Sequence, residues 1–277
     1  MKLVCNLNNM NELSKLAPYA DFILLKRELC TLDNLRKIKA QNLVPILDYS
    51  LMVTPFEIEK LTKEIMTFKD EDCLFYITDL GLAHILKEAN LITRTIYDPI
   101  TMLTNSLDVN EYASYGFKAL GLSNEITIED TKNIVLNSVC PLFIQVFGHR
   151  LMFHSRRKLT SLYAEKLNVT FEQKNMVIKE ATREDYFPIE ETKNGTYIYR
   201  SYAINMLEKL KELDIDFIFL NSYRIVFSTY LEVVKIYADY LEDKLNLAEA
   251  LEKFRSLNVH TEDGFMYTDS VYNKEEF

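Results

Sequence analysis

The segment Leu43–Thr78, LVPILDYSLMVTPFEIEKLTKEIMTFKDEDCLFYIT, contains a strand, a helix and a second strand in order. Leu43–Tyr49 and Cys73–Thr78 are short apolar runs, which are typical of buried strands. Between them, Thr54–Glu57 reads TPFE, with an N-cap Thr, a Pro at the first helical position and a Glu that completes a capping box. Apolar residues then recur at helical spacing at Ile58, Leu61, Ile65 and Phe68. This order predicts a βαβ unit with parallel strands.

The same alternation extends over most of the chain. Six further apolar runs are predicted to be strands: Lys2–Leu7, Asp21–Lys26, Leu91–Tyr97, Phe117–Leu122, Cys140–Phe147 and Asp216–Asn221. Amphipathic stretches separate the first seven strands, and a repeat of roughly 20 residues per unit favours closure into a barrel. The predicted fold class is therefore α/β, a parallel (β/α) TIM-like barrel, regular or distorted, with an insertion after the seventh strand. An open doubly wound sheet is the alternative.

The alternation stops after Gly148 and returns near residue 203. Arg150–Leu167 is basic and is predicted to be helical, and Asn194-Gly195 is a turn signal between two strand-like runs. A further helix is predicted from the apolar residues Ile204, Leu207, Leu210 and Leu213. The sequence thus predicts three parts: a barrel domain of residues 1–148 and 203–241, an inserted helix and β-hairpin segment of residues 149–202, and a C-terminal tail of residues 242–277 that packs on the barrel.

Composition and charge exclude several classes of protein. The chain has 277 residues, of which 48% are hydrophobic, with only 6 Gly and 6 Pro, so collagen-like and Pro-rich disordered proteins are excluded. No apolar run approaches the roughly 18 residues of a membrane helix. The start, MKLVCN, has no apolar secretion region, so we expect no membrane association and a cytoplasmic location. The net charge of −9 gives no overall basic surface for nucleic acid, although a local basic patch could still bind RNA.

Active sites of parallel barrels lie at the C-terminal ends of the strands. The polar residues at or just after the predicted strand ends are Lys26, Arg27, Asp48, Tyr49, Asp79, Asp98, Ser123, Glu125, His149, Asn221 and Arg224. Any one of them is more often a helix cap or a loop residue than a functional group. As a set, they predict that several polar groups converge on one mouth of the barrel.

The stretch Gly148–Lys158, GHRLMFHSRRK, concentrates two of the four histidines and four basic residues in an acidic chain. Such a patch suits a phosphate, a carboxylate or an RNA backbone; the alternative is a solvated helix face paired with the acidic region Glu180–Glu191. The candidate substrate-binding residues are Asn105, Arg150, Arg156, Arg157 and Arg183. The candidate catalytic residues are Glu125, His149 and His154.

The sequence predicts no metal site. All four cysteines stand more than four residues apart, so no CxxC spacing exists, and buried free thiols are expected. His149 and His154 are five residues apart, which does not place both rings on one helical face, and no HExxH occurs.

Three segments resemble motifs of the collagenase-like peptidase family, a family of unknown catalytic type. They are Gly116–Ile126 (GFKALGLSNEI), Gln145–Ser161 (QVFGHRLMFHSRRKLTS) and Tyr186–Ser201 (YFPIEETKNGTYIYRS), in the order and spacing of the family. Two cysteines of the second motif fall on Leu151 and Lys158 here. Members that hold an iron–sulfur cluster use cysteines that include this pair, and four thiolates are usually needed. The resemblance therefore implies a member without an iron–sulfur cluster, and no other cofactor is expected.

The resemblance implies two activities. Some members are named as collagen-degrading proteases, and others act in oxygen-independent hydroxylation of tRNA wobble uridine or of ubiquinone precursors, with prephenate as a hydroxyl source. Because no nucleophile–base pair or metal-water site can be recognised, we expect an enzyme of tRNA wobble-uridine hydroxylation, with tRNA and a cysteine-bearing paralogue as partners. The first alternative is a peptidase, a collagenase-like hydrolase of unknown catalytic type. The second is a non-catalytic barrel that binds RNA or protein.

Overall fold

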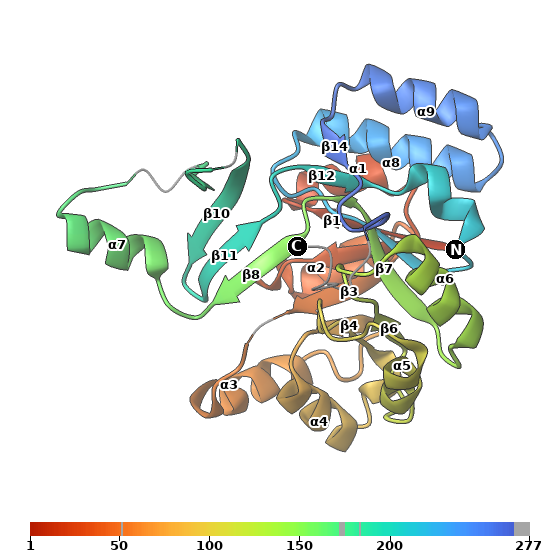
Figure 1. Cartoon of the computed structure of the whole chain (residues 1–277). Coiled ribbons are helices and arrows are strands. Elements are labelled where there is room, and N and C mark those ends of the chain that lie inside the picture. Colours follow the sequence, from red (N-terminus) through yellow and green to blue (C-terminus); the bar gives the residue numbers. More distant parts are fainter. Residues whose placement is uncertain (51, 172–174, 183, 269–277) are drawn as a thin grey trace.

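The computed structural model describes residues 1–50, 52–171, 175–182 and 184–268. Within these residues, eight parallel strands follow one another around a closed barrel (Figure 1). The strands are β1 (Lys2–Leu7), β2 (Phe22–Leu25), β3 (Val44–Tyr49), β4 (Leu74–Ile77), β5 (Thr95–Tyr97), β6 (Ala119–Gly121), β7 (Leu142–Gly148) and β13 (Phe217–Leu220). β13 pairs with β1 on one side and with β7 on the other, which closes the sheet. The predicted parallel barrel is confirmed, and the open-sheet alternative is wrong.

Helices cover the outside of the barrel between successive strands (Figure 1). They are α1 (Leu13–Leu16), α2 (Leu32–Lys39), α3 (Pro55–Met66), α4 (Leu80–Glu88), α5 (Ser106–Ala113), α6 (Ile128–Asn137) and α8 (Phe227–Leu241). Each buries an apolar face; on α2, for example, Leu35 and Ile38 are buried against the strands. α3 begins where the sequence predicts, and the Thr54 N–H donates a hydrogen bond to the Glu57 carboxylate at 3.0 Å.

The predicted helix Arg150–Leu167 is wrong in its first part. Leu151–Ser155 forms strand β8, and the helix in this region, α7, spans only Leu159–Leu167. β8 pairs antiparallel with β11 (Gly195–Tyr199), a strand that follows much later in the chain. Long-range strand pairing therefore decides the conformation of this stretch, and local sequence preference does not.

The segment Ile204–Leu213 also differs from the predicted helix. Ala203–Asn205 forms strand β12, which pairs antiparallel with the end of β7, and Leu207–Glu212 forms a 3₁₀ helix. The apolar residues recur at every third position and are all buried: Ile204, Leu207, Leu210 and Leu213. That spacing is the period of a 3₁₀ helix, whereas an α-helix repeats every 3.6 residues.

The chain between β7 and β12 forms a second, antiparallel sheet beside the barrel (Figure 1). Its strand order is β8-β11-β10-β9, with β9 at Val177–Lys179 and β10 at Tyr186–Thr192. β10 and β11 form a hairpin whose turn lies at Lys193 and Asn194, next to the predicted Asn194-Gly195 signal. Figure 1 shows α7 extending away from the barrel on the far side of this sheet.

The C-terminal region adds α9 (Leu247–Ser256) and β14 (Thr261–Glu262). α9 packs against α8 with Ala250 and Phe254 buried, and β14 pairs parallel with β12. The end of the predicted tail, residues 269–277, lies outside the described residues. Within the described part of the chain, no helix is both long enough and apolar enough to span a membrane.

Apolar side chains fill both sides of the barrel wall. The larger cluster lies between the strands and the outer helices. The smaller cluster fills the barrel interior with Val4, Phe22, Leu24, Val44, Ile46, Leu74, Tyr76, Ile96, Ala119, Phe143, Phe217 and Phe219. The Phe143 ring lies 5.8 Å from Phe219 and 5.4 Å from Tyr76 between ring centroids. The interior is therefore a packed floor beneath the C-terminal mouth of the barrel.

Candidate functional site

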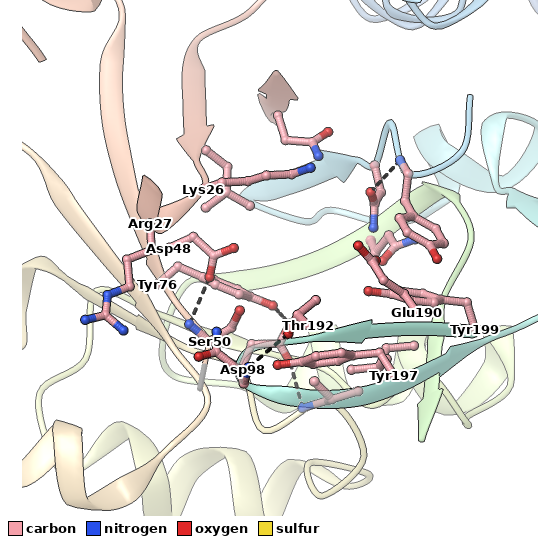
Figure 2. A pocket seen from close by; sticks show the side chains of 18 of the residues that line it. Lys26, Arg27, Asp48, Ser50, Tyr76, Asp98, Glu190, Thr192, Tyr197 and Tyr199 are labelled. Carbon is pink, nitrogen blue, oxygen red and sulfur yellow. Dashed lines mark hydrogen bonds between the residues drawn. The ribbon is translucent and has the colours of Figure 1, made fainter. Parts of the chain in front are cut away.

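Polar side chains form the layer directly above the apolar floor of the barrel. Because side chains alternate along a strand, the next inward position lies two residues after each apolar one. This step leads from Val4 to Asn6, Leu24 to Lys26, Ile46 to Asp48, Ile96 to Asp98, Phe143 to Gln145 and Phe219 to Asn221. The six polar residues line a cavity of about 610 Å³ at the C-terminal ends of the strands, the mouth cavity (Figure 2).

The hairpin β10–β11 forms one wall of the mouth cavity (Figure 2). Its lining side chains include Glu190, Thr192, Tyr197 and Tyr199. Tyr199 stacks on Tyr223, which follows β13, with 3.9 Å between ring centroids. Tyr197 stacks on His154 of β8 at 4.2 Å. The cavity thus combines the polar layer of the barrel, which lies above its apolar floor, with an aromatic wall from the inserted sheet.

Asp98 is held at the floor of the mouth cavity by two hydrogen bonds. The Tyr76 hydroxyl donates to Oδ2 at 2.7 Å, and the Ile100 N–H donates to Oδ1 at 2.8 Å. Burial raises the pKa of Asp98 to about 6, while these hydrogen bonds and the positive charge of Arg150 act in the opposite direction. Since a carboxyl with this pKa exchanges its proton readily near neutral pH, Asp98 is the strongest candidate for proton transfer in the cavity.

The backbone around Asp98 is shaped for this arrangement. Gly121 of β6 faces the carboxyl, and a Cβ atom at Gly121 would lie 2.2 Å from the Asp98 carboxyl carbon. Ile100 has a φ of 69°, a left-handed conformation that is strained for a β-branched residue. Its N–H donates to Asp98, and its carbonyl oxygen accepts the Asn124 N–H at 3.0 Å. These contacts hold the strained residue at the edge of the cavity.

A second carboxyl, Asp48, lies near the end of β3. Burial raises its pKa, and hydrogen bonds from Ser50 and the charge of Lys26 oppose that change. The Ser50 N–H donates to Asp48 Oδ1 at 2.9 Å. Arg27 lines the same cavity while its Nε and Nη2 donate to Glu64 at 2.9 and 2.5 Å. The mouth cavity therefore presents carboxyl groups and cations to the same ligand.

Five of the strand-end residues that the sequence singles out line the mouth cavity: Lys26, Arg27, Asp48, Asp98 and Asn221. Asp79 instead caps α4, since its carboxylate accepts the Leu82 N–H at 3.1 Å. Asn105 is likewise the N-cap of α5 and accepts the Asp108 N–H at 2.9 Å. Both residues therefore cap helices, which is the structural role that Asp and Asn often have at such positions.

Arg150 lies at the edge of the mouth cavity, with its side chain buried. Its guanidinium donates to the carbonyl oxygens of Asn124 at 2.9 Å and Gln145 at 3.1 Å, and both of those residues line the cavity. Burial lowers the pKa of Arg150 to about 10, so the group stays positive at neutral pH. Arg150 therefore supports the residues that line the cavity.

The other arginines of the basic stretch lie further out. Arg156 forms an ion pair with Glu57 at 2.8 Å, so its partner is on α3 and not in the acidic region Glu180–Glu191. Arg157 is exposed. Arg183 lies outside the described residues.

None of the three candidate catalytic residues is among those that line the mouth cavity. Glu125 is exposed. His149 Nδ1 lies 2.8 Å from the Arg200 carbonyl oxygen, and His154 is covered by Tyr197. Burial lowers the pKa of both histidines. Within the described residues, neither ring has a hydrogen bond to a Ser or Cys side chain, so no nucleophile–base pair forms there.

The aromatic wall and part of the polar layer are not among the residues that the sequence singles out. Asn6 and Tyr76 continue the inward alternation of β1 and β4, so a strict two-residue count along each strand would have found them. Glu190, Tyr197 and Tyr199 come from the inserted hairpin. Their place against the mouth depends on how that sheet docks on the barrel, and no local pattern encodes this docking.

The donor atoms do not fit an iron–sulfur cluster. At the two motif positions, Leu151 lines the mouth cavity and Lys158 is exposed. Burial raises the pKa of Cys5 and of Cys30 to about 12, which keeps both as thiols. Among the described residues, no group of three or more His, Cys, Asp or Glu side chains is placed to hold a metal ion. The thiolates that a cluster needs are therefore missing from the motif.

The fold and the cavity define a class of protein: a parallel (β/α) barrel with a polar cavity at its C-terminal mouth and an inserted β-hairpin as one wall. The sequence pattern of Peptidase family U32 matches residues 46–273, which is more than half of the chain. The chain belongs to this family, in agreement with the resemblance of its motifs.

Two further proteins are similar to this chain. The tRNA hydroxylation protein P2 of Bacillus subtilis (strain 168) is 24% identical over 189 residues, which cover 61% of this chain and 61% of the relative. The match thus spans about three fifths of that relative's length. The structure of the U32 peptidase Mk0906 has a TM-score of 0.50 and 14% identity, over 80% of this chain and 92% of that chain. This second likeness supports the fold alone.

Proposed function

We propose that this chain acts in the hydroxylation of the wobble uridine of tRNA, without an iron–sulfur cluster, and that its mouth cavity receives the uridine base. Membership of family U32 and the distant relative named tRNA hydroxylation protein P2 support this reaction class. The observation that carries the proposal is the mouth cavity, which joins amide side chains, an acid with a pKa of about 6 and a tyrosine wall.

The mouth cavity suits a uracil ring. The ring is planar and has two carbonyl oxygens and one ring N–H. Amide side chains can both donate to and accept from these groups, and the cavity has five of them: Asn6, Asn124, Gln145, Asn194 and Asn221. Tyr197 and Tyr199 offer aromatic faces on which an unstacked base can lie. The cavity volume of about 610 Å³ is within the usual range for ligand pockets.

Hydroxylation replaces a ring hydrogen by a hydroxyl group from a donor, and the donor takes up the displaced hydrogen. Asp98, with Tyr76 on its carboxylate, is the group that we assign to moving the proton. Lys26 and Arg27 line the same cavity and suit an anionic hydroxyl donor. Prephenate, which the family resemblance suggests, is such a donor, and a cysteine-bearing paralogue is the proposed protein partner.

Nucleoside analysis of tRNA from a strain that lacks this chain tests the proposal. We expect nucleosides derived from 5-hydroxyuridine to disappear and to return when the gene is restored. Unchanged tRNA together with lost peptide hydrolysis would favour the peptidase instead. Unchanged tRNA and unchanged hydrolysis, with RNA binding retained, would favour a non-catalytic RNA-binding barrel.

Tyr197→Leu tests the aromatic wall. Removing a stacking partner is expected to weaken binding of a short single-stranded oligouridylate about tenfold, at the lower end of measured base–aromatic stacking effects. Binding is measured by titration of the purified protein. Tyr163→Leu is the matched control, because Tyr163 is an exposed tyrosine of α7 outside the mouth cavity. If both variants bound oligouridylate with equal affinity, Tyr197 would not be part of the binding site.

A further inference from the structure

A second cavity of about 270 Å³ lies beside the mouth cavity, between α3 and the turn of the β10–β11 hairpin. Four basic side chains line it: Arg27, Lys60, Arg156 and Lys193. Arg27, Lys193 and Asn194 line both cavities, so the two share one rim. A ligand that fills the mouth cavity can therefore continue into the smaller one. In a chain with a net charge of −9, this is an unusual concentration of positive charge.

The ion pairs of this second cavity leave donors free. Among the described residues, Arg156 uses only Nη1, for its contacts with Glu57 and the Met52 carbonyl oxygen. Arg27 uses Nε and Nη2 for Glu64, which leaves Nη1. Lys193 is exposed and holds Glu28 only loosely, at 3.6 Å.

Lys60 is the least satisfied cation of the second cavity. It is exposed on α3, and among the described residues the structure gives it no ion pair. The negative group of the cavity lining, Glu57, is ionised, since hydrogen bonds from Arg156 and Thr54 lower its pKa to about 2, and the ion pair with Arg156 balances its charge. The cavity therefore has unused N–H donors and surplus positive charge, which suit an anion.

We propose that the second cavity binds a backbone phosphodiester of the RNA strand whose uridine occupies the mouth cavity. This inference rests on the proposed function. In RNA, the phosphate lies next to the nucleoside that carries the base, as the two cavities lie next to each other along their shared rim. Arginine and lysine side chains are the usual partners of phosphate oxygens. Such contacts fix the register of the strand, while the base contacts select uridine.

Lys60→Ala in the full chain tests the phosphate site, with a short single-stranded oligouridylate and free uridine as the two probes. We expect oligouridylate affinity to fall about tenfold, as for the loss of one charge-assisted contact. The slope of log affinity against log salt should fall in magnitude by about 0.7, the value for one phosphate on a single strand. Uridine carries no phosphate, so its affinity should not change.

Lys63→Ala is the matched control. Lys63 lies on the same helix, pairs with Glu59 at 2.6 Å and is outside the second cavity, and its loss changes the net charge equally. Equal oligouridylate affinity and equal salt slope in the two variants would overturn the phosphate site and leave the proposed function standing. Failure of the native protein to bind either probe would overturn both proposals. If Lys60→Ala lowered the affinity for an acidic peptide but not for oligouridylate, the cavity would bind a different ligand and the inference would be overturned.

Discussion

Asp98→Asn is expected to abolish the formation of 5-hydroxyuridine-derived nucleosides while leaving the protein at least as stable as the native chain at neutral pH. Asn cannot exchange a proton, so the function assigned to Asp98 is lost. Its single amide oxygen can accept either the Tyr76 hydroxyl or the Ile100 N–H, which keeps one of the two hydrogen bonds of the native carboxyl. The activity is measured by returning the variant gene to a strain that lacks the chain.

The stability effect of Asp98→Asn depends on pH. The pKa of Asp98 is about 6 in the folded protein, against an ordinary value of 3.8. Between about pH 4 and pH 6 the folded chain therefore binds a proton that the unfolded chain has lost, so native stability falls as pH rises through this range. The total cost at neutral pH is on the order of 2–3 kcal/mol. Asn does not ionise and escapes this cost.

Thermal unfolding at several pH values measures this effect. The melting temperature of Asp98→Asn minus that of the native protein should increase from about pH 4 to about pH 6 and then level off. Asp33→Asn serves as the control, because Asp33 is an exposed residue of α2 paired with Lys37. Its effect should stay within about 0.5 kcal/mol at every pH. A constant difference between Asp98→Asn and the native protein would show that Asp98 has an ordinary pKa.

Arg150→Met is expected to lower the free energy of unfolding by about 2–3 kcal/mol and to abolish tRNA modification. The carbonyl oxygens of Asn124 and Gln145 lose the donors that now lie 2.9 and 3.1 Å away. The charge that opposes the rise in the Asp98 pKa is also removed, so that pKa should rise above 6. Met has a similar length and fills most of the space, so a cavity is not the main cause of the loss.

Denaturant unfolding measures the stability of Arg150→Met, and carbon NMR of Asp98 measures the change in its pKa. Arg157→Met is the matched control, since Arg157 is exposed and its change should stay within about 0.5 kcal/mol. A variant as stable as the native protein would mean that desolvation of the buried guanidinium cancels its hydrogen bonds. An unchanged Asp98 pKa would contradict the proposed coupling between the two residues.

The barrel could be predicted from the sequence because its strands are local signals. Runs such as Leu43–Tyr49 are apolar and bounded by polar residues. Amphipathic helices separate them, and the capping residues of these helices can be recognised in the sequence. β8 could not be predicted, since its partner β11 is distant in sequence and the basic composition of Leu151–Ser155 and its neighbours suggests a surface helix. Strand pairing over such distances is a property of the whole fold.

Part of the candidate site could also be predicted from the sequence, and part could not. Lys26, Asp48 and Asp98 follow barrel strands directly, so the rule for strand ends places them at the mouth. The local concentration of basic residues did not predict which of them line the cavity. In the basic stretch Gly148–Lys158, Arg150 is buried, and Arg157 is exposed outside the mouth cavity.

Gly121 and Asp98 constrain each other's evolution. Any side chain on Gly121 would occupy the volume of the Asp98 carboxyl, with even a Cβ only 2.2 Å from its carbon, so a substitution at position 121 depends on the residue at position 98. A lineage that gains a side chain at the β6 position must first give up the acid, and with it the proton chemistry assigned here. Relatives that keep an aspartate directly after β5 are therefore expected to keep glycine opposite it.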